Sequence, residues 1–401
     1  MSKLLLFVLL LVAVQTEAQV ITLDSVLHAI DRSYPMIKMY EVMADARSEY
    51  ARSASSWMPP KITAGLWQTP YNAIGDGMFM VGVEQMIPNP AKVNAKERMM
   101  LSEAALDRAS QSVALRDMHT MAKRAYYGRS VLERKLRAID ETDSLLAFVI
   151  ALATDRYPTG KESLENIYKA QAARAELSSM RTMTTADIGM NNAELRNFLG
   201  AATATFQIDT TLPVSGTASD RMLTDSIPEV RSIDAEITMM RSRRDVERSA
   251  LYPEFGVSVN HMQALNTMMP NQFSVMGMVS LPIAPWSRTE ADAMSAGVDR
   301  EIESMQLKRD ATIRERAAKI EILRAQVDGS RTQLENITTV VLPAYQRSFD
   351  ASLRAYQQNA GDLFRVIDAW QMLRMAEMNR LDLLKSLINA QISYEDALSN
   401  D

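Results

Sequence analysis

The apolar residues of this chain recur with two different periods, and each period is confined to its own segments. In two long segments they follow alternating steps of four and three residues, which places them along one side of a helix. The first segment contains Leu132, Leu136, Ile139, Leu146, Ile150 and Ala153, interrupted once at Asp143. The second contains Ile320, Leu323, Val327, Leu334, Ile337 and Val341, interrupted once at Ser330. This spacing predicts long helices that pack as a coiled coil.

Four shorter segments alternate between apolar and polar residues, with the period of two that is typical of strands. They are KITAGLW (61–67), FMVGVEQMI (79–87), FGVSVNHM (255–262) and QFSVMGMVSL (272–281). A loop separates the two members of each neighbouring pair. The pattern therefore predicts two β-hairpins whose apolar residues share one face.

The second half of the chain repeats the order of the first. Pro35 and Pro228 lie 193 residues apart, and each precedes a helical pattern. The segment RYPTGKESLENIYKAQ (156–171) has a counterpart 199 residues later in AYQQNAGDLFRVIDAW (355–370). Because order and spacing are both kept, we interpret the chain as two tandem copies of one unit.

This organisation predicts a fold that is mainly α with a small β part. A signal peptide at 1–18 precedes the first copy, and a linker at 201–225 separates the two copies. The first copy spans 19–200, with its hairpin at about 61–87, its long helix at about 91–154 and its returning helix at about 160–199. The second copy spans 226–401, with the same elements at about 255–283, 287–355 and 360–398.

The N-terminal residues MSKLLLFVLLLVAVQTEAQ have the composition of a secretory signal. Lys3 is followed by eleven apolar residues, Leu4 to Val14, and a small residue, Ala18, precedes the expected cleavage site. The apolar run is too short for a membrane-spanning helix, which needs about 20 residues. The chain contains no cysteine, so we expect an exported protein without disulfides and without a lipid anchor on a thiol.

Composition and motifs exclude several classes of function. The net charge is −5 and no run of lysine and arginine occurs, which argues against a nucleic-acid partner. No nucleophile, metalloprotease or nucleotide-binding motif is present, so we expect neither an enzyme nor a cofactor. The 28 methionines include the pairs Met268–Met269 and Met276–Met278, and thioethers are suitable ligands for Cu(I). Methionine is also a common helix former and adaptable core residue, so we predict no dedicated metal site.

The two hairpins restrict how the chain could enter a membrane. Strands can cross lipid only within a closed barrel, because hydrocarbon satisfies no hydrogen bonds at a sheet edge. Four strands are too few to close. Three chains would supply twelve strands, an even number large enough to surround a lumen.

The sequence resembles the TolC family of outer-membrane efflux proteins over essentially the whole mature chain. ITLDSVLHAIDRSYPMI (21–37) is similar to the family's first helix, SSWMPPKITAG (55–65) to its entry into the first strand, and 156–171 with NFLG (197–200) to its returning helix. The resemblance implies a homotrimer with a 12-stranded β-barrel in the outer membrane and a 12-helix α-barrel in the periplasm. It also implies a passive conduit that works with a periplasmic adaptor protein and an inner-membrane efflux pump.

The resemblance also assigns roles to residues in the two turns. It places Tyr157 and Gly160 in the first copy, and Tyr356 and Asn359 in the second, at the periplasmic tip that docks the adaptor. Gly160 and Asn359 suit a turn that needs a positive φ.

For the second copy the resemblance further implies that Tyr356 and Asp368 face the lumen as a gate or filter. Gly361 occupies the position where the family has a basic residue, so we do not assign a gating bond there. Arg365 precedes Asp368 by three positions, and two interpretations remain open. Asp368 could form a ring of unpaired carboxylates, or it could pair with Arg365.

Two other functions remain compatible with the sequence. One is a type I protein-secretion channel of the same family, and the other is a periplasmic coiled-coil structural protein that never enters a membrane. The substrate is not indicated, because in such systems the inner-membrane pump normally selects it.

Overall fold

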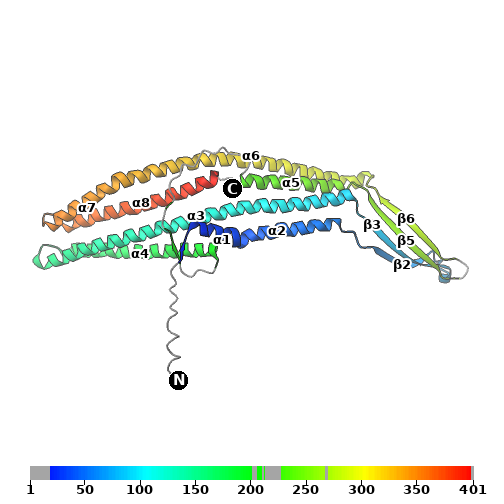
Figure 1. Cartoon of the computed structure of the whole chain (residues 1–401), viewed down its shortest axis with the longest axis horizontal. Coiled ribbons are helices and arrows are strands. Elements are labelled where there is room, and N and C mark those ends of the chain that lie inside the picture. Colours follow the sequence, from blue (N-terminus) through cyan, green and yellow to red (C-terminus); the bar gives the residue numbers. More distant parts are fainter. Residues whose placement is uncertain (1–18, 201–205, 210–211, 213–226, 267–269, 399–401) are drawn as a thin grey trace, which may run out of the picture. The chain divides into compact units, whose positions relative to one another are not determined.

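The computed structural model describes residues 19–200, 206–209, 212, 227–266 and 270–398. Helices make up most of this part of the chain and strands a small part, which confirms the predicted fold class (Figure 1). The predicted signal peptide (1–18), most of the predicted linker (201–225), Met268 and Met269 lie outside the described residues. None of the helices in the described ranges is long and apolar enough to cross a membrane.

The first copy folds in the order helix, helix, hairpin, long helix, returning helix. Its elements are α1 (Leu23–Ser33), α2 (Pro35–Arg52), β2 (Lys61–Trp67), β3 (Met78–Ile87), α3 (Pro90–Arg156) and α4 (Leu164–Leu199). Two of the helices begin at a hydroxyl cap: the side chain of Thr22 accepts a hydrogen bond from the Ser25 amide, and that of Ser163 accepts one from the Asn166 amide. Short 3₁₀ turns link several of these elements.

The second copy begins with one helix where the first has two. Its elements are α5 (Pro228–Ser249), β5 (Glu254–Ala264), β6 (Gln272–Ser280), α6 (Pro285–Asn336), α7 (Leu342–Gln357) and α8 (Leu363–Leu398). Proline is the first residue of α2, α3, α5 and α6, where its missing N–H costs no helical hydrogen bond and its fixed φ already suits the helix.

A π-helical turn, Ile337–Val341, separates α6 from α7. Pro343 lies two residues after this turn, and its ring would collide with the carbonyl of Thr339 in an ordinary α-helix. The wider π-helical turn relieves that collision. The predicted helix at about 287–355 is therefore not one continuous α-helix, whereas α3 of the first copy is.

The chain forms two compact units, and neither unit corresponds to one copy. Of the described residues, the first contains 19–37, 115–200, 206–209, 212 and 316–398, and the second contains 38–114, 227–266 and 270–315. Each unit thus combines segments from both halves of the sequence. The long helices α3 and α6 each contribute one part to each unit.

In the first unit, α3, α4, α7 and α8 share one hydrophobic core. The predicted coiled-coil positions Ile139, Leu146 and Ala153 are completely or almost completely buried in it. Asp143, the exception in the apolar rhythm, accepts two hydrogen bonds from Arg174 of α4, at 2.8 Å and 3.0 Å. The interruption in the pattern is thus a charged link between the two packed helices.

The second unit contains all four long strands in one sheet of order β2-β3-β5-β6, with every neighbouring pair antiparallel. The central β3–β5 pair joins the two hairpins, running from Met78 opposite Ala264 to Ile87 opposite Phe255. The outer strands β2 and β6 have no further strand partner in the described chain. Four helices, α2, α3, α5 and α6, accompany the sheet in this unit (Figure 1).

A second, very small sheet lies in the first unit. Strand β1 (Gln19–Ile21) pairs in parallel with β4 (Phe206–Ile208). The buried hydroxyl of Tyr126 donates to the carbonyl oxygens of Ile21 (3.0 Å) and Asp209 (3.2 Å), so α3 holds both strands. Part of the segment predicted as a linker therefore belongs to the folded unit.

Candidate functional site

The sheet has one apolar face. The antiparallel register places Ile62, Val83, Val259 and Val275 in a row across all four strands. The neighbouring row contains Ala64, Val81, His261 and Phe273. These side chains are exposed even though most are large and apolar. We call this surface the Val275 face, and its apolar character is what lipid contact requires.

The opposite surface, which we call the Asn260 face, is built from small, polar and methionine residues. One row across the strands is Thr63, Gly82, Asn260 and Ser274. The Asn260 side chain occupies the space that a Cβ atom at Gly82 would need, and its Nδ2 donates to Ser274 Oγ at 3.2 Å. Asn260 is buried. Side chains on this face therefore cover neighbouring strands, which suits the inner side of a curved sheet.

Exposed aromatic residues mark both ends of the strands. Trp57 precedes β2, Tyr252 precedes β5 and Trp286 follows β6, so all three lie at the end of the sheet that joins the helices. Trp67 and Tyr71 lie at the opposite end, after β2. Aromatic residues at two levels with an apolar band between them are typical of strands that cross a membrane.

The two turns that connect the long and returning helices have related backbones. In the first, a 3₁₀ turn from Tyr157 to Thr159 ends at Gly160, which has φ = 70°. In the second, Asn359 follows α7 and has φ = 58°. Both residues adopt the left-handed conformation that the sequence predicts. We call these two turns, 157–163 and 358–362, the tip.

Side chains fasten the two turns of the tip to each other. The Tyr356 hydroxyl donates to Glu162 Oε2 at 2.7 Å, and the Arg156 guanidinium lies 4.5 Å from the centre of the Tyr356 ring. Arg156 also donates to the backbone carbonyls of Tyr356 and Gln357. Burial, followed by the bond to Glu162, raises the pKa of Tyr356 above its usual value. The phenol is therefore held as a neutral donor.

Equivalent residues of the two copies differ in these contacts. Tyr356 is 1% exposed, whereas its counterpart Tyr157 is 43% exposed. Arg156 and Glu162 correspond at the same 199-residue spacing to Ala355 and Gly361. The contacts thus use charged residues that only the first copy has.

Arg156 and Glu162 were not among the residues predicted from the sequence. The signal was their departure from the repeat, because small residues replace both of them in the second copy. Gly361 is also tightly surrounded: a Cβ atom there would lie 3.0 Å from the Tyr356 backbone nitrogen. The lack of a side chain at Gly361 therefore allows the turn to approach α7 closely.

Arg365 and Asp368 are both exposed on α8, one turn apart. Within the described residues, no ion pair of 4.0 Å or less joins them. The ring of Tyr356, by contrast, is enclosed by its own chain, and it would meet a lumen only after the Arg156 and Glu162 contacts open.

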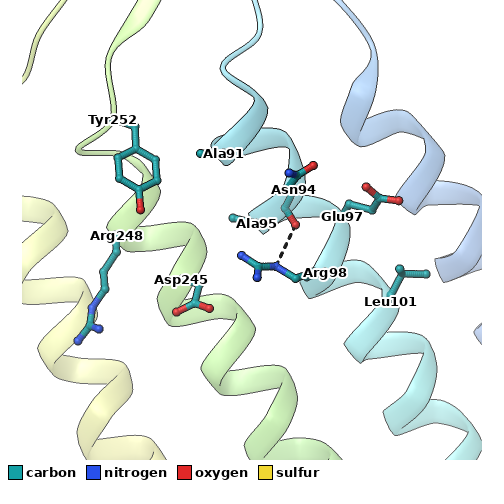
Figure 2. Close-up of a pocket in the computed structure, with 9 residues that line it drawn as sticks. All are labelled: Ala91, Asn94, Ala95, Glu97, Arg98, Leu101, Asp245, Arg248 and Tyr252. Atoms are coloured by element: carbon teal, nitrogen blue, oxygen red, sulfur yellow. Dashed lines mark hydrogen bonds between the residues drawn. The ribbon is translucent and has the colours of Figure 1, made fainter.

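A polar groove of about 760 Å³ lies between α3 and α5 in the second unit, next to the strands (Figure 2). Figure 2 shows the Asp245 carboxylate and the Arg98 guanidinium extending into the space between these helices. Arg248 turns away from it and donates to Ser295 Oγ at 2.9 Å and to Asp299 at 3.3 Å. The groove is open and carries charges of both signs, so its side chains do not favour an ion of one particular charge.

The comparisons with known proteins agree with this architecture. Residues 222–399 match the family described as outer membrane efflux protein. This region, which contains the second copy of the repeat, carries the sequence pattern of that family and confirms the resemblance predicted from the sequence. No curated protein matches its sequence.

Solved structures show that other TolC-like channels share the fold over nearly the whole chain. VceC from Vibrio cholerae is 13% identical, with a TM-score of 0.76, and the match covers 94% of this chain and 95% of that one. CusC is 13% identical with a TM-score of 0.78, covering 94% and 92%. The CmeC outer membrane channel of Campylobacter jejuni is 13% identical with a TM-score of 0.74, covering 94% and 85%.

The family match of residues 222–399 supports the predicted channel protein of the outer membrane that extends into the periplasm, and not an enzyme. It decides against the periplasmic structural protein that the sequence alone left possible. The family in general assembles as trimers with an adaptor and an inner-membrane pump.

Proposed function

We propose that three copies of this chain form the outer-membrane conduit of a tripartite efflux system, through which solutes delivered by an inner-membrane pump leave the cell. The observation that carries the proposal is the four-stranded sheet with two open outer strands and one apolar face. An open edge is unfavourable in lipid, because its N–H and C=O groups have no partners there. Pairing between copies removes both edges.

The order of the strands supports a closed ring of copies. Because β2, β3, β5 and β6 alternate in direction, β6 of one copy and β2 of the next would also pair in antiparallel fashion. Three copies give twelve strands, with the Val275 face toward lipid and the Asn260 face toward the lumen. The helices of the same copies would continue the conduit as a ring of helices in the periplasm.

The tip is the proposed docking surface for the adaptor. Tyr157 and Gly160 lie in a turn that is exposed, and no atom lies within 4 Å of the position of a Cβ atom at Gly160. A partner could approach this backbone closely. Asn359 gives the second turn the same backbone conformation, so a trimer would present six related tips.

The contacts of Tyr356 are the proposed gate. Together with Arg156 and Glu162 they fasten the turn after α7 to the turn after α3. Releasing them would free the α7–α8 pair to move while α3 and α4 stay in place. Asp368 and Arg365, exposed on α8, would then face the lumen near the aperture.

The absence of cysteine allows a direct test of the conduit. Each of Ile62→Cys, Ala64→Cys and Leu66→Cys on β2 is combined with Val275→Cys on β6, and the outer membrane is oxidised before denaturing electrophoresis. At least one pair is expected to produce covalent dimers and trimers. Three positions on β2 are tested because the structure of one chain does not fix the register between β2 and the β6 strand of the next copy.

A matched control uses the central strands. Val83 and Val259 are directly opposite each other in the same chain, so Val83→Cys with Val259→Cys should give no link between copies. If none of the β2–β6 pairs yields covalent trimers while the chain is present in the outer membrane, the proposed ring is wrong.

A further inference from the structure

All methionines of the four long strands lie on the same face of the sheet. They are Met78, Met80, Met86, Met262, Met276 and Met278, and each belongs to the Asn260 face. The Val275 face has none, although it is the apolar one. If methionine served here only as a hydrophobic side chain, it would be expected on that face instead. The segregation indicates that these thioethers are useful on the Asn260 face itself.

Two of these methionines converge above a glycine. Gly256 of β5 pairs with Met86 on one side and with Met278 on the other. The Met86 Sδ atom lies 2.8 Å, and the Met278 Cε atom 3.2 Å, from the point where a Cβ atom at Gly256 would be. The two methionines belong to β3 and β6, which do not pair with each other. Because Gly256 has no side chain, the Met86 sulfur and the Met278 methyl group can both lie above it.

A further methionine lies beside Met86 but not beside Met278. Met58, just before β2, lines a cavity of about 200 Å³ together with Met86. Its backbone carbonyl accepts a 2.9 Å hydrogen bond from Gln85, which fixes its position beside β3. Lys92 lines the same cavity, and its charge is balanced by Glu254 at 2.7 Å. Lys96 lines the cavity as well, so the methionine pair on the sheet is a more favourable place for a cation than the cavity itself.

The sequence alone predicted no dedicated metal site, but from this arrangement we infer that Met86 and Met278 form a thioether site that binds a soft monovalent cation, Cu(I) or Ag(I). Thioether sulfur is neutral and polarisable, and it selects such ions over Na⁺, Mg²⁺ or Ca²⁺, which prefer oxygen ligands. Methionine side chains have three rotatable bonds, so small rotations suffice to bring the sulfur atoms around one ion. Because thioether ligands carry no charge, they can release the bound ion again, and a conduit must release what it carries.

The site itself requires only this sheet. Its use in transport rests on the proposed function, because the Asn260 face lines the lumen only in the trimer. The remaining methionines of that face would then continue a soft lining along the barrel. This names a class of substrate that the channel would assist: soft metal cations delivered by the pump.

Silver is the suitable probe, because Ag⁺ resembles Cu(I) and is not oxidised in air. The full protein, solubilised in mild detergent and chloride-free buffer, is titrated with silver nitrate by calorimetry. Met86→Leu with Met278→Leu keeps the side-chain volume and removes both sulfur atoms. We expect the affinity for one Ag⁺ per chain to fall at least about tenfold. X-ray absorption of the Ag⁺-loaded protein should show sulfur ligands.

The matched control is Met183→Leu with Met190→Leu, two exposed methionines of α4 in the other unit. This variant should bind Ag⁺ as the original chain does. Gly256→Ala provides an independent test, because the added Cβ atom would meet Met86 Sδ and should also weaken binding. If the first variant fails to assemble, Met278→Leu alone removes one of the two sulfur atoms and still lowers affinity if the inference is correct.

The inference is overturned if Met86→Leu/Met278→Leu binds Ag⁺ with unchanged affinity and stoichiometry, or if the α4 control loses binding equally. Either outcome leaves the proposed conduit intact, since that is judged by the β2–β6 cross-links. Conversely, failure of the cross-links with methionine-dependent Ag⁺ binding would retain the site and remove its role in transport.

Discussion

The hydroxyl of Tyr356 donates a 2.7 Å hydrogen bond to Glu162, a residue 194 positions earlier in the chain. The bond joins the turn of the second copy to the turn of the first. Arg156 reinforces it by covering the Tyr356 ring and donating to the backbone beside it. The two turns of one chain are thus held together by side chains that have no counterparts across the repeat.

Replacing Tyr356 by Phe should loosen this contact and raise single-channel conductance in planar bilayers. A hydrogen bond to a carboxylate contributes roughly 1.5–3 kcal/mol, enough to shift a closed population about tenfold or more toward open states. Tyr157→Phe, at the exposed counterpart, is the control and should change nothing. Equal conductance of Tyr356→Phe and the unmodified channel would show that the bond does not restrain the aperture.

The pair Asp143–Arg174 should make stability depend on pH. The two hydrogen bonds from Arg174 lower the pKa of Asp143 below its usual value. A lowered pKa in the folded state gives a contribution that is present above the usual pKa and is lost as the pH falls through the folded value. Asp143→Asn should therefore lower the urea midpoint at pH 7 more than at pH 3. Glu176→Gln on α4 is the control, and an equal effect at both pH values would contradict the assignment.

Val275→Arg should reduce the amount of assembled trimer in the outer membrane. An arginine on the lipid-facing side of a strand costs about 2–4 kcal/mol near the middle of the membrane, and each copy in the assembly carries it. Met276→Arg places the same charge on the neighbouring residue, on the Asn260 face, and should assemble. The comparison is made on isolated outer membranes by semi-native electrophoresis. If both variants assemble equally well, the two faces are assigned incorrectly.

Asp368→Asn should reduce the cation selectivity of the channel and weaken its block by multivalent cations. Asp368 is exposed and has no ion pair with Arg365 within the described residues, so three copies would present three carboxylates to one narrow lumen. Converging like charges attract cations. Reversal potentials in a salt gradient measure the effect, with Asp382→Asn, which removes a partner of Lys135, as the control. Unchanged selectivity would leave Asp368 outside the filter.

Gly160→Val should abolish pump-dependent resistance while the trimer remains abundant. The space around Gly160 is open, so the strain arises from its φ of 70° and not from a collision, at a cost of about 1–2 kcal/mol. Gly160→Asn should be tolerated, because Asn359 has a similar φ in the second turn. Gly189→Val in the middle of α4, where space is also open, is the control. Full resistance with Gly160→Val would exclude this turn as the docking surface.

Much of the fold could be predicted because its determinants are local. Proline at 35, 90, 228 and 285 starts a helix in each case, and the alternation along 61–67 and 272–281 reports two unlike faces of one sheet. The interruption at Pro343 was harder to predict. The apolar rhythm continues through Ile337 and Val341, and the ring of a proline two residues beyond changes the backbone without changing that rhythm.

The site was predicted only in part. The backbone conformation of Gly160 and Asn359 follows from residue type, since few residues accept a positive φ. The burial of Tyr356 depends on Arg156 and Glu162, which lie about 200 positions away in the chain. No single segment carries that information. Comparison of the two copies does indicate these residues. Where the turn of one copy contacts the turn of the other, the contacting residues can differ between the copies, and such differences are visible in the sequence.

This difference between the copies has a consequence for symmetry. A ring assembled from six identical single repeats would have the same side chains at every turn, so arginine would meet arginine around the aperture. With two repeats in one chain, a trimer keeps six turns of one backbone shape but alternates two chemistries, Arg156 with Glu162 and then Ala355 with Gly361. Duplication within the chain thus replaces sixfold symmetry by threefold symmetry. Each charged turn then lies next to an uncharged turn, with which it can form side-chain contacts.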